Sequence, residues 1–196
     1  KTITGSYKGR RMTALSTGIG TDNIDIVVTE LDALANIDFA TRQVKDEFKQ
    51  LTLLRLGTSG AVQEDIKVGE RVFSRTSVGF DGLINFYAGR NEACDLEFEE
   101  AFKKHLNWSP LLCAPYTVPA DKELTERIAK NDMVRGVTIS CGGFFGPQGR
   151  QLRVPLAFPK QNELVESFEF EGQHITNFEM ESSALAGLAV LMGHKA

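Results

Sequence analysis

Apolar residues in the first half of the chain alternate between strand and helix spacing. The run from Met12 to Leu15 predicts a short strand, and the apolar residues between Ile24 and Leu34 recur at helical intervals. A second helix is expected from Asp38 to Lys49, followed by a buried strand from Leu51 to Leu56. The β-branched and aromatic residues from Arg71 to Val78 predict another strand.

The second half continues this alternation. The apolar residues from Phe98 to Leu106 fall on one helical face, and the segment from Asp121 to Lys130 is typical of a charged helix. Val134–Cys141 and Ile175–Phe178 predict strands. The second of these leads into a helix from Ser182 to Met192, which the following glycine ends.

This order of elements predicts an α/β fold, layered, with a central mixed or largely parallel β-sheet flanked by helices. Residues 1–196 are expected to form a single domain, because no repeat or low-complexity linker divides them. In open sheets of this kind, ligands bind beyond the carboxyl ends of strands. The glycine-containing loops after Leu15 and after Leu56 are expected at such ends, where they can share one ligand.

Composition narrows the classes of protein. A chain of 196 residues with 42% hydrophobic and 24% charged residues is typical of a globular protein. The absence of a 20-residue apolar run and of a secretory leader predicts a soluble, cytoplasmic protein with no membrane partner. A net charge of −4 argues against a nucleic-acid partner. Three widely spaced cysteines indicate neither a disulfide framework nor a zinc site.

An arginine inside an apolar run is the first candidate for chemistry. Arg55 cannot lose its charge, so a buried strand tolerates it only where something anionic meets it. Gly57 and Gly60 follow and allow backbone N–H groups to approach a ligand, while Thr58 and Ser59 add hydroxyl groups. The segment therefore predicts an oxyanion site, with phosphate as the expected anion.

The loop from Ser16 to Gly20 has two interpretations. It lacks both the full dinucleotide fingerprint and the lysine of a P-loop, so its glycines can simply permit a tight turn between strand and helix. The alternative is a phosphate bound at the N-terminus of the helix that follows.

A third segment runs from Phe144 to Arg150. Gln148 both donates and accepts hydrogen bonds and Arg150 only donates, so the pair suits a flat heterocycle that carries carbonyl groups, such as uracil. Phe144 can lie against the face of such a ring. The alternative is a surface turn with a solvated glutamine and arginine.

The fourth segment is Asn177 to Ser182, at a junction of strand and helix. The carboxylates of Glu179 and Glu181 can accept hydrogen bonds from sugar hydroxyls while Met180 covers the sugar. The alternative is that acidic residues simply complement the positive N-terminal end of the helix.

In order and spacing, these four segments together resemble the nucleoside phosphorylase superfamily and, within it, the uridine phosphorylases. The Gln148-x-Arg150 element is the one that favours uridine phosphorylases over the purine enzymes. The resemblance implies a pentosyltransferase that converts uridine and phosphate reversibly to uracil and ribose 1-phosphate in pyrimidine salvage. It implies no metal and no cofactor, with phosphate as co-substrate.

The resemblance also implies a role for each position. Arg55, Arg150 and Glu181 are the expected catalytic residues. Arg150 is expected to stabilise the negative charge that develops on uracil as the glycosidic bond breaks. The expected binding residues are Arg55, Thr58 and Gly20 for phosphate, Thr58, Glu179, Met180 and Glu181 for ribose, and Phe144, Gln148 and Arg150 for the base.

Members of this superfamily carry further segments on both sides of the matching region. Before it lie a Gly-Asp-Pro phosphate loop and an arginine, and after it a strand and a helix, so we expect this chain to be incomplete at both ends. The family also donates a histidine and an arginine across a dimer interface, which implies a homodimer that can assemble to a hexamer. The chain's own histidines, His105, His174 and His194, are expected at the surface.

Three alternatives stay open at this point. A purine nucleoside phosphorylase of the same fold is opposed by the Gln148 and Arg150 pair. A nucleosidase that uses water is opposed by Arg55, because a water nucleophile gives no reason for a buried anion-binding cation. A non-catalytic nucleoside-binding fragment is the third.

Overall fold

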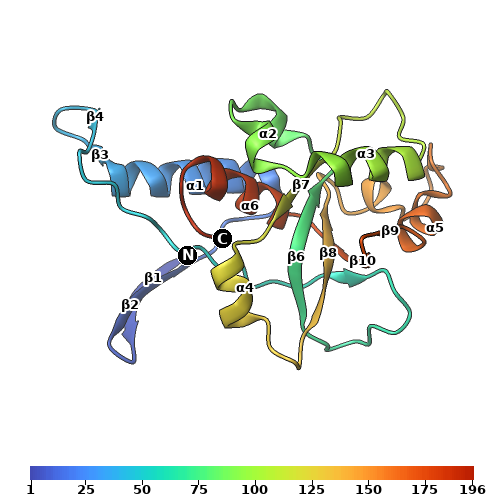
Figure 1. Cartoon of the computed structure of the whole chain (residues 1–196), viewed down its shortest axis with the longest axis horizontal. Helices are drawn as coiled ribbons and strands as arrows, with labels where there is room; N and C mark the ends of the chain where they lie inside the picture. Colours follow the sequence, from blue (N-terminus) through green and yellow to red (C-terminus); the bar gives the residue numbers. More distant parts are fainter.

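A mixed β-sheet forms the centre of the protein (Figure 1). The computed structural model describes all residues from 1 to 196. Three of the strands, β6, β8 and β10, are parallel to one another, and short antiparallel strands pair with the outer two. In spatial order the strands are β5 (Gly60–Ala61), β10 (Gln173–Glu179), β8 (Val134–Ser140), β6 (Val72–Gly79) and β7 (Tyr116–Pro119), with β9 (Glu169–Phe170) on β10. The predicted α/β class is confirmed.

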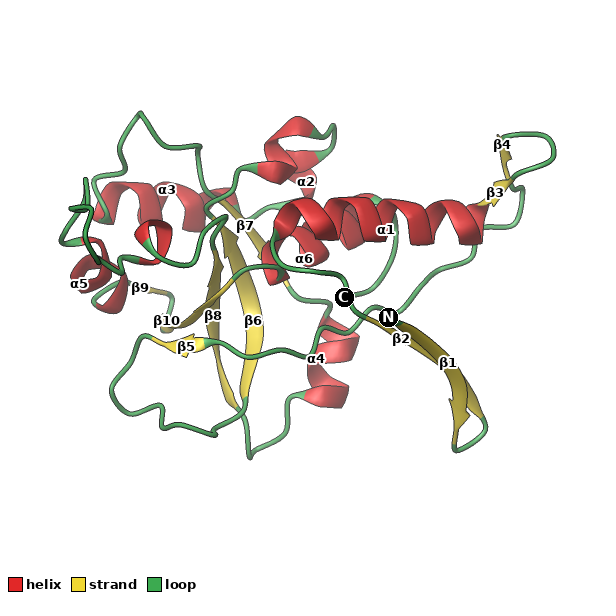
Figure 2. Ribbon diagram, turned by 180° about the vertical axis from the view of Figure 1, so that it is seen from behind, coloured by secondary structure: helices red, strands yellow, loops and turns green.

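Helices cover both faces of this sheet, as the two views show (Figures 1 and 2). On one side α1 (Thr21–Asn36) packs against α6 (Ser182–Leu191), and on the other lie α3 (Leu96–His105) and α5 (Gln161–Glu166). The remaining helices are short: α2 (Arg90–Ala93), α4 (Lys122–Ile128), and 3-10 turns at Leu83–Phe86 and Gly146–Gln148. No helix has both the length and the apolar character needed to cross a membrane.

The alternation of side chains along the strands explains the two hydrophobic cores. In β8, Val137 and Ile139 pack with Phe98 and Phe102 of α3. Ser140 points to the opposite face, where its hydroxyl donates to Glu179 at the end of β10 and lies 3.1 Å from the Ser182 hydroxyl at the start of α6. The second core lies on that face, where α1 and α6 meet β7. The sheet is thus buried on both sides, as parallel strands require.

Most predicted elements are confirmed. Strands occur at the expected places in β6, β8 and β10, and helices in α1, α3, α4 and α6. Gly193 ends α6 with a positive φ of 75°, a conformation in which glycine carries no steric penalty. Asp121, at the start of the predicted charged helix, caps α4 by accepting the N–H of Leu124 at 2.9 Å.

The helix predicted from Asp38 to Lys49 is wrong. The segment forms a small hairpin, β3 (Ile37–Asp38) with β4 (Gln43–Val44), followed by an irregular stretch. The Asp38 carboxylate accepts the N–H of Ala40 at 2.8 Å, and Arg42 has a φ of 58°. Both features make a turn, and a left-handed residue cannot continue an α-helix.

The buried strand predicted from Leu51 to Leu56 is also wrong. The segment is extended, but its one ladder contact is an isolated bridge between Thr52 and Lys195. Its side chains alternate: Leu54 is 60% exposed and Leu56 is 97% exposed, while Arg55 faces inward. An apolar run that alternates in this way mimics the pattern of a fully buried strand.

The strand predicted at Met12–Leu15 exists but lies outside the central sheet. It forms the last four residues of β2 (Arg10–Leu15), which pairs only with β1 (Thr2–Tyr7) in a hairpin that projects from the body (Figure 1). The side chains of this hairpin are exposed up to Leu15. The unit of strand, loop and helix that was expected there is present, because the chain passes from Leu15 through Ser16–Gly20 into α1.

Candidate active site

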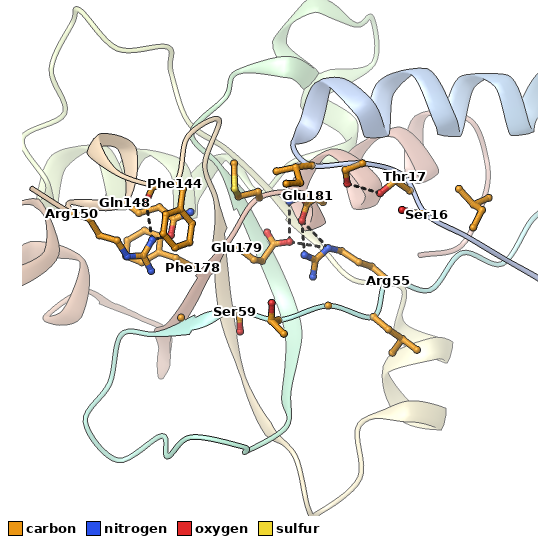
Figure 3. Close-up of a pocket in the computed structure, with 18 residues that line it drawn as sticks. Ser16, Thr17, Arg55, Ser59, Phe144, Gln148, Arg150, Phe178, Glu179 and Glu181 are labelled. Carbon is orange, nitrogen blue, oxygen red and sulfur yellow. Dashed lines mark hydrogen bonds and ion pairs between the residues drawn. The ribbon is translucent and has the colours of Figure 1, made fainter. Parts of the chain in front are cut away.

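All four chemistry-bearing segments of the sequence line one cavity of about 580 Å³ (Figure 3). They are residues 15–19, residues 55–60, the loop that carries Phe144, Gln148 and Arg150, and residues 178–181. The loops after Leu15 and Leu56 therefore do meet at one place, as expected. Neither loop follows a strand of the central sheet, however, so the predicted reason for their meeting is wrong.

Arg55 lies between two carboxylates (Figure 3). Its Nη2 is 2.5 Å from Oε2 of Glu181, and its Nε is 3.1 Å from Oε2 of Glu179. The Arg55 side chain is 25% exposed, whereas both glutamates are buried. The anion that meets this cation within the chain is thus a pair of carboxylates, and Nη1 donates no hydrogen bond to the protein.

Glu179 stands at the end of β10 and holds the start of α6. Its carboxylate accepts the backbone N–H groups of Glu181 and Ser182, each at 2.9 Å, and the Ser182 hydroxyl at 2.8 Å. The Ser140 hydroxyl of β8 donates to the same carboxylate. For Glu179, the interpretation that an acidic residue complements the helix N-terminus is confirmed.

Glu181 joins three segments that are distant in sequence. One carboxylate oxygen accepts the N–H of Gly20 at 2.8 Å, at the start of α1, while the other accepts from Arg55. Gly20 has a φ of 95°, which glycine adopts without strain. The N–H expected to bind phosphate therefore binds Glu181, and Met180 lies beside it on the cavity wall.

Gln148 and Arg150 form the other end of the cavity. Gln148 is only 2% exposed, and its Oε1 accepts a hydrogen bond from Arg150 Nη1. Arg150 also donates to the backbone carbonyl of Phe144 at 2.8 Å, and its guanidinium lies 4.2 Å from the centroid of the Phe144 ring. The alternative of a solvated surface turn is wrong.

The amide nitrogen of Gln148 has no hydrogen-bond partner although it is buried. A buried donor without an acceptor costs about 1–3 kcal/mol, so such a group is rare in a native fold unless a ligand or water completes it. The amide thus offers hydrogen-bond donors beside the Arg150 guanidinium, in a part of the cavity lined by Phe144 and Phe178.

The comparisons with known proteins identify the family and the fold. The family model described as the Phosphorylase superfamily matches residues 1–196. The chain belongs to the phosphorylase superfamily. A nucleoside phosphorylase from Trypanosoma brucei, whose crystal structure is described as showing uridine phosphorylase activity, superposes with a TM-score of 0.86 at 27% identity. That match covers 100% of this chain and 71% of the trypanosome chain, and it confirms the nucleoside phosphorylase fold.

Curated relatives of this phosphorylase-superfamily chain have two substrate classes in their names. It is 27% identical to a uridine phosphorylase from Thermococcus kodakarensis, covering 100% of this chain and 58% of the relative. It is 28% identical to a DeoD-type purine nucleoside phosphorylase from Anoxybacillus flavithermus, covering 99% of this chain and 63% of the relative. The chain thus spans about three fifths of the length of these relatives.

His194 corrects a further expectation. His105 and His174 are exposed, as predicted, but His194 is buried in this phosphorylase-superfamily chain. Its Nδ1 accepts the N–H of Leu51 at 3.3 Å, and its Nε2 lies 3.1 Å from Oδ1 of Asp32 on α1. The ring also stacks on Phe48, so the irregular stretch after β4 covers His194, which is 146 positions away in sequence.

Sequence reasoning also missed a polar cluster around the partly buried Asp81, which contacts the start of α6 through Ser183. Asp81 accepts from the Tyr116 hydroxyl at 3.0 Å, from the Ser183 hydroxyl at 3.3 Å, and from the N–H of Leu83 at 2.8 Å. Burial raises the pKa of the Asp81 carboxyl above its ordinary value, and burial also raises the pKa of Tyr116. These residues are far apart in sequence, and no local pattern marks them.

The thiols of Cys94 and Cys141 are unsuited to nucleophilic chemistry. Burial raises the pKa of the Cys94 thiol to about 11, and burial raises the pKa of the Cys141 thiol further. A thiol must ionise to act as a nucleophile, so both groups are protonated at neutral pH.

Proposed function

We propose that this protein is a uridine phosphorylase, which transfers the ribosyl group of uridine to inorganic phosphate and releases uracil. The observation that carries the proposal is the buried Gln148 amide without an acceptor, held beside Arg150. Uracil presents carbonyl oxygens, which accept hydrogen bonds from the Gln148 amide N–H and the Arg150 guanidinium, and a ring N–H, which can donate to the second lone pair of Gln148 Oε1. The order and spacing of the four cavity-lining segments support the same assignment.

We assign each part of the reaction to a part of the cavity. Uracil lies at the end formed by Phe144, Gln148 and Arg150, and the ribose hydroxyls bind the carboxylate of Glu181 beside Met180. Glu179 supports the ribose-binding part of the cavity, because it holds Arg55 and the start of α6. Phosphate binds the free Nη1 of Arg55 and the loop of Thr58, near the Gly20 turn. The two carboxylates keep Arg55 directed into the cavity (Figure 3).

In the proposed reaction the bond between the anomeric carbon and the base nitrogen breaks, and its electron pair moves to uracil. The sugar passes through an oxocarbenium-like state, and a phosphate oxygen forms the new bond to the anomeric carbon. Donors at Arg150 and Gln148 stabilise the negative charge on uracil more than they stabilise neutral uridine. Arg55 places the phosphate for attack, which is catalysis by orientation.

The purine-cleaving relatives provide the second candidate function. We expect faster phosphate-dependent cleavage of uridine than of inosine, because the amide and guanidinium of the base end match uracil. The test compares kcat/KM for the two nucleosides at saturating phosphate, with uracil and hypoxanthine separated by chromatography. Faster turnover of inosine overturns the uridine assignment.

Phosphate dependence separates the remaining alternatives. Cleavage at the same rate without phosphate identifies a nucleosidase. Uridine binding without formation of ribose 1-phosphate identifies a non-catalytic module.

The proposal also includes the setting that the family resemblance implies, a homodimer able to assemble to a hexamer in the cytoplasm, serving pyrimidine salvage.

Replacing Gln148 with alanine is expected to raise the KM for uridine about 10-fold while leaving the KM for phosphate unchanged. The substitution removes the donor amide and also the acceptor that holds Arg150 Nη1. Steady-state kinetics with each substrate varied in turn checks this. Gln43→Ala, at an exposed position in β4, serves as the control. An equal rise in both KM values contradicts the role at the base end.

A further inference from the structure

Two glycines of the loop that crosses the cavity lie against its two arginines. A Cβ atom built on Gly57 would be 2.8 Å from both Nη1 and Nη2 of Arg55 and 2.9 Å from its Cζ. A Cβ atom built on Gly60 would be 2.8 Å from Nη2 of Arg150. Ordinary van der Waals contact begins near 3.4 Å, so neither guanidinium could stay in place if these residues had side chains.

Backbone conformation does not explain these glycines. Neither Gly57 nor Gly60 has a positive φ, in contrast to Gly18 and Gly20 in the neighbouring loop. The sign of φ therefore does not require glycine at either position. What distinguishes both positions is the close approach of an arginine side chain, which an added Cβ atom would displace.

The contact at Gly57 fixes Arg55 from a direction that the carboxylates do not. The near-equal distances to Nη1, Nη2 and Cζ mean that Gly57 lies against the flat face of the guanidinium. Glu181 and Glu179 bind the guanidinium through its N–H groups, which lie in the plane. Together they fix both the plane and the rotation of the group.

Gly60 lies against Arg150, at the end of the cavity assigned to the base, as Gly57 lies against Arg55. The guanidinium of Arg150 lies over the ring of Phe144, and its Nη1 is taken by Gln148 and the Phe144 carbonyl. The other terminal nitrogen, Nη2, approaches Gly60. It is the one heavy atom that a Cβ atom built on Gly60 would meet within 4 Å. Gly60 also begins β5, which pairs with β10 at Phe178, so its backbone is tied to the sheet.

We infer that Gly57 and Gly60 are positioning residues that set the two arginines independently, and thereby the separation of the bound phosphate from the departing base. The inference rests on the proposed function for the roles of Arg55 and Arg150. Gly57 acts on phosphate through Arg55, and Gly60 acts on the base through Arg150. The short loop between them is a spacer of fixed length.

The test uses Gly57→Ala and Gly60→Ala in the full chain, with Gly5→Ala as the matched control. Gly5 lies in the exposed β1 strand and has no heavy atom within 4 Å of its missing Cβ. An added methyl must displace each guanidinium by several tenths of an ångström, and misplacement by 1 Å can cost about 100-fold in rate. We expect Gly57→Ala to raise the KM for phosphate about 10-fold and Gly60→Ala to raise the KM for uridine about 10-fold.

A double-mutant cycle separates positioning from a general effect on structure. If Gly57 acts through the guanidinium, Gly57→Ala has little further effect in an Arg55→Lys background, because lysine lacks the planar group. The same holds for Gly60→Ala in an Arg150→Lys background. Additive effects in both cycles, or an equal rise of both KM values in each single variant, overturn the inference.

Failure of the proposed function gives a different result. A wild-type protein that cleaves inosine faster than uridine overturns the uridine assignment, but the separate effects on phosphate and nucleoside are then measured with inosine. A wild-type protein without turnover overturns the enzymatic proposal. Calorimetric titrations with inorganic phosphate and with uracil then supply the two affinities, and loss of both in either variant overturns the inference.

Discussion

Replacing Arg55 with alanine is expected to lower kcat/KM for phosphate by about 100-fold or more, with a much smaller effect on uridine binding. The substitution removes the cation to which the proposed function assigns phosphate binding. It also leaves the carboxylates of Glu179 and Glu181 without their positive partner, so the cavity repels a phosphate anion. The measurement is the initial rate of uracil release at phosphate concentrations well below KM.

The matched control is Arg71→Ala. Arg71 also pairs with a carboxylate, Asp132, at 2.5 Å, but both side chains are more than half exposed, at 66% and 57%. An exposed pair of this kind contributes about 0–1 kcal/mol, so its loss should leave phosphate use unchanged. Similar losses in the two variants, or equal losses for phosphate and uridine in Arg55→Ala, would show that Arg55 does not bind phosphate.

Replacing Arg90 with methionine is expected to lower the free energy of unfolding by about 3–5 kcal/mol. Arg90 Nη2 lies 2.6 Å from Oε2 of Glu99 on α3, and the two side chains are only 17% and 5% exposed. The other carboxylate oxygen of Glu99 accepts the N–H of Thr117 in β7 at 2.9 Å. Without Arg90, a charged carboxylate stays buried with no cation beside it. Urea unfolding followed by circular dichroism measures the loss.

Two companion variants sharpen this second prediction. Arg127→Met removes an exposed i,i+4 pair with Glu123 and should change stability by less than about 0.5 kcal/mol. Arg90→Met combined with Glu99→Gln removes the unpaired charge and should recover part of the loss. If Arg90→Met alone costs no more than Arg127→Met, the pair does not stabilise the fold.

Periodicity in the sequence was sufficient to predict the helices and strands that have a buried apolar face. The helix with Phe98 and Phe102 and the strand with Val137 and Ile139 carry an unambiguous apolar pattern, and both are present. The pattern failed between Asp38 and Leu56, where no residue is fully buried. There the conformation depends on single side-chain contacts, such as those of the Asp38 carboxylate, and on pairing with Lys195 at the other end of the chain.

The candidate site, too, was predictable from the sequence in its residue types but not in its contacts. The residue types at Arg55, Gln148 and Glu181 indicate their chemistry, and the structure brings all three to one cavity. Their contacts were beyond the sequence, because the Gly20 to Glu181 hydrogen bond spans 161 positions and no local signal reports it. The burial of His194 was missed for a similar reason, since its cover comes from Phe48 and Asp32.

The Glu179 carboxylate has two roles in the structure, which limits the substitutions that position 179 can accept. The same carboxylate receives the first N–H groups of α6 and steadies Arg55. A substitution that removes this carboxylate is therefore expected to disturb both the start of α6 and the position of Arg55. If the proposed function holds, selection for catalysis and selection for a well-formed fold act here on a single side chain.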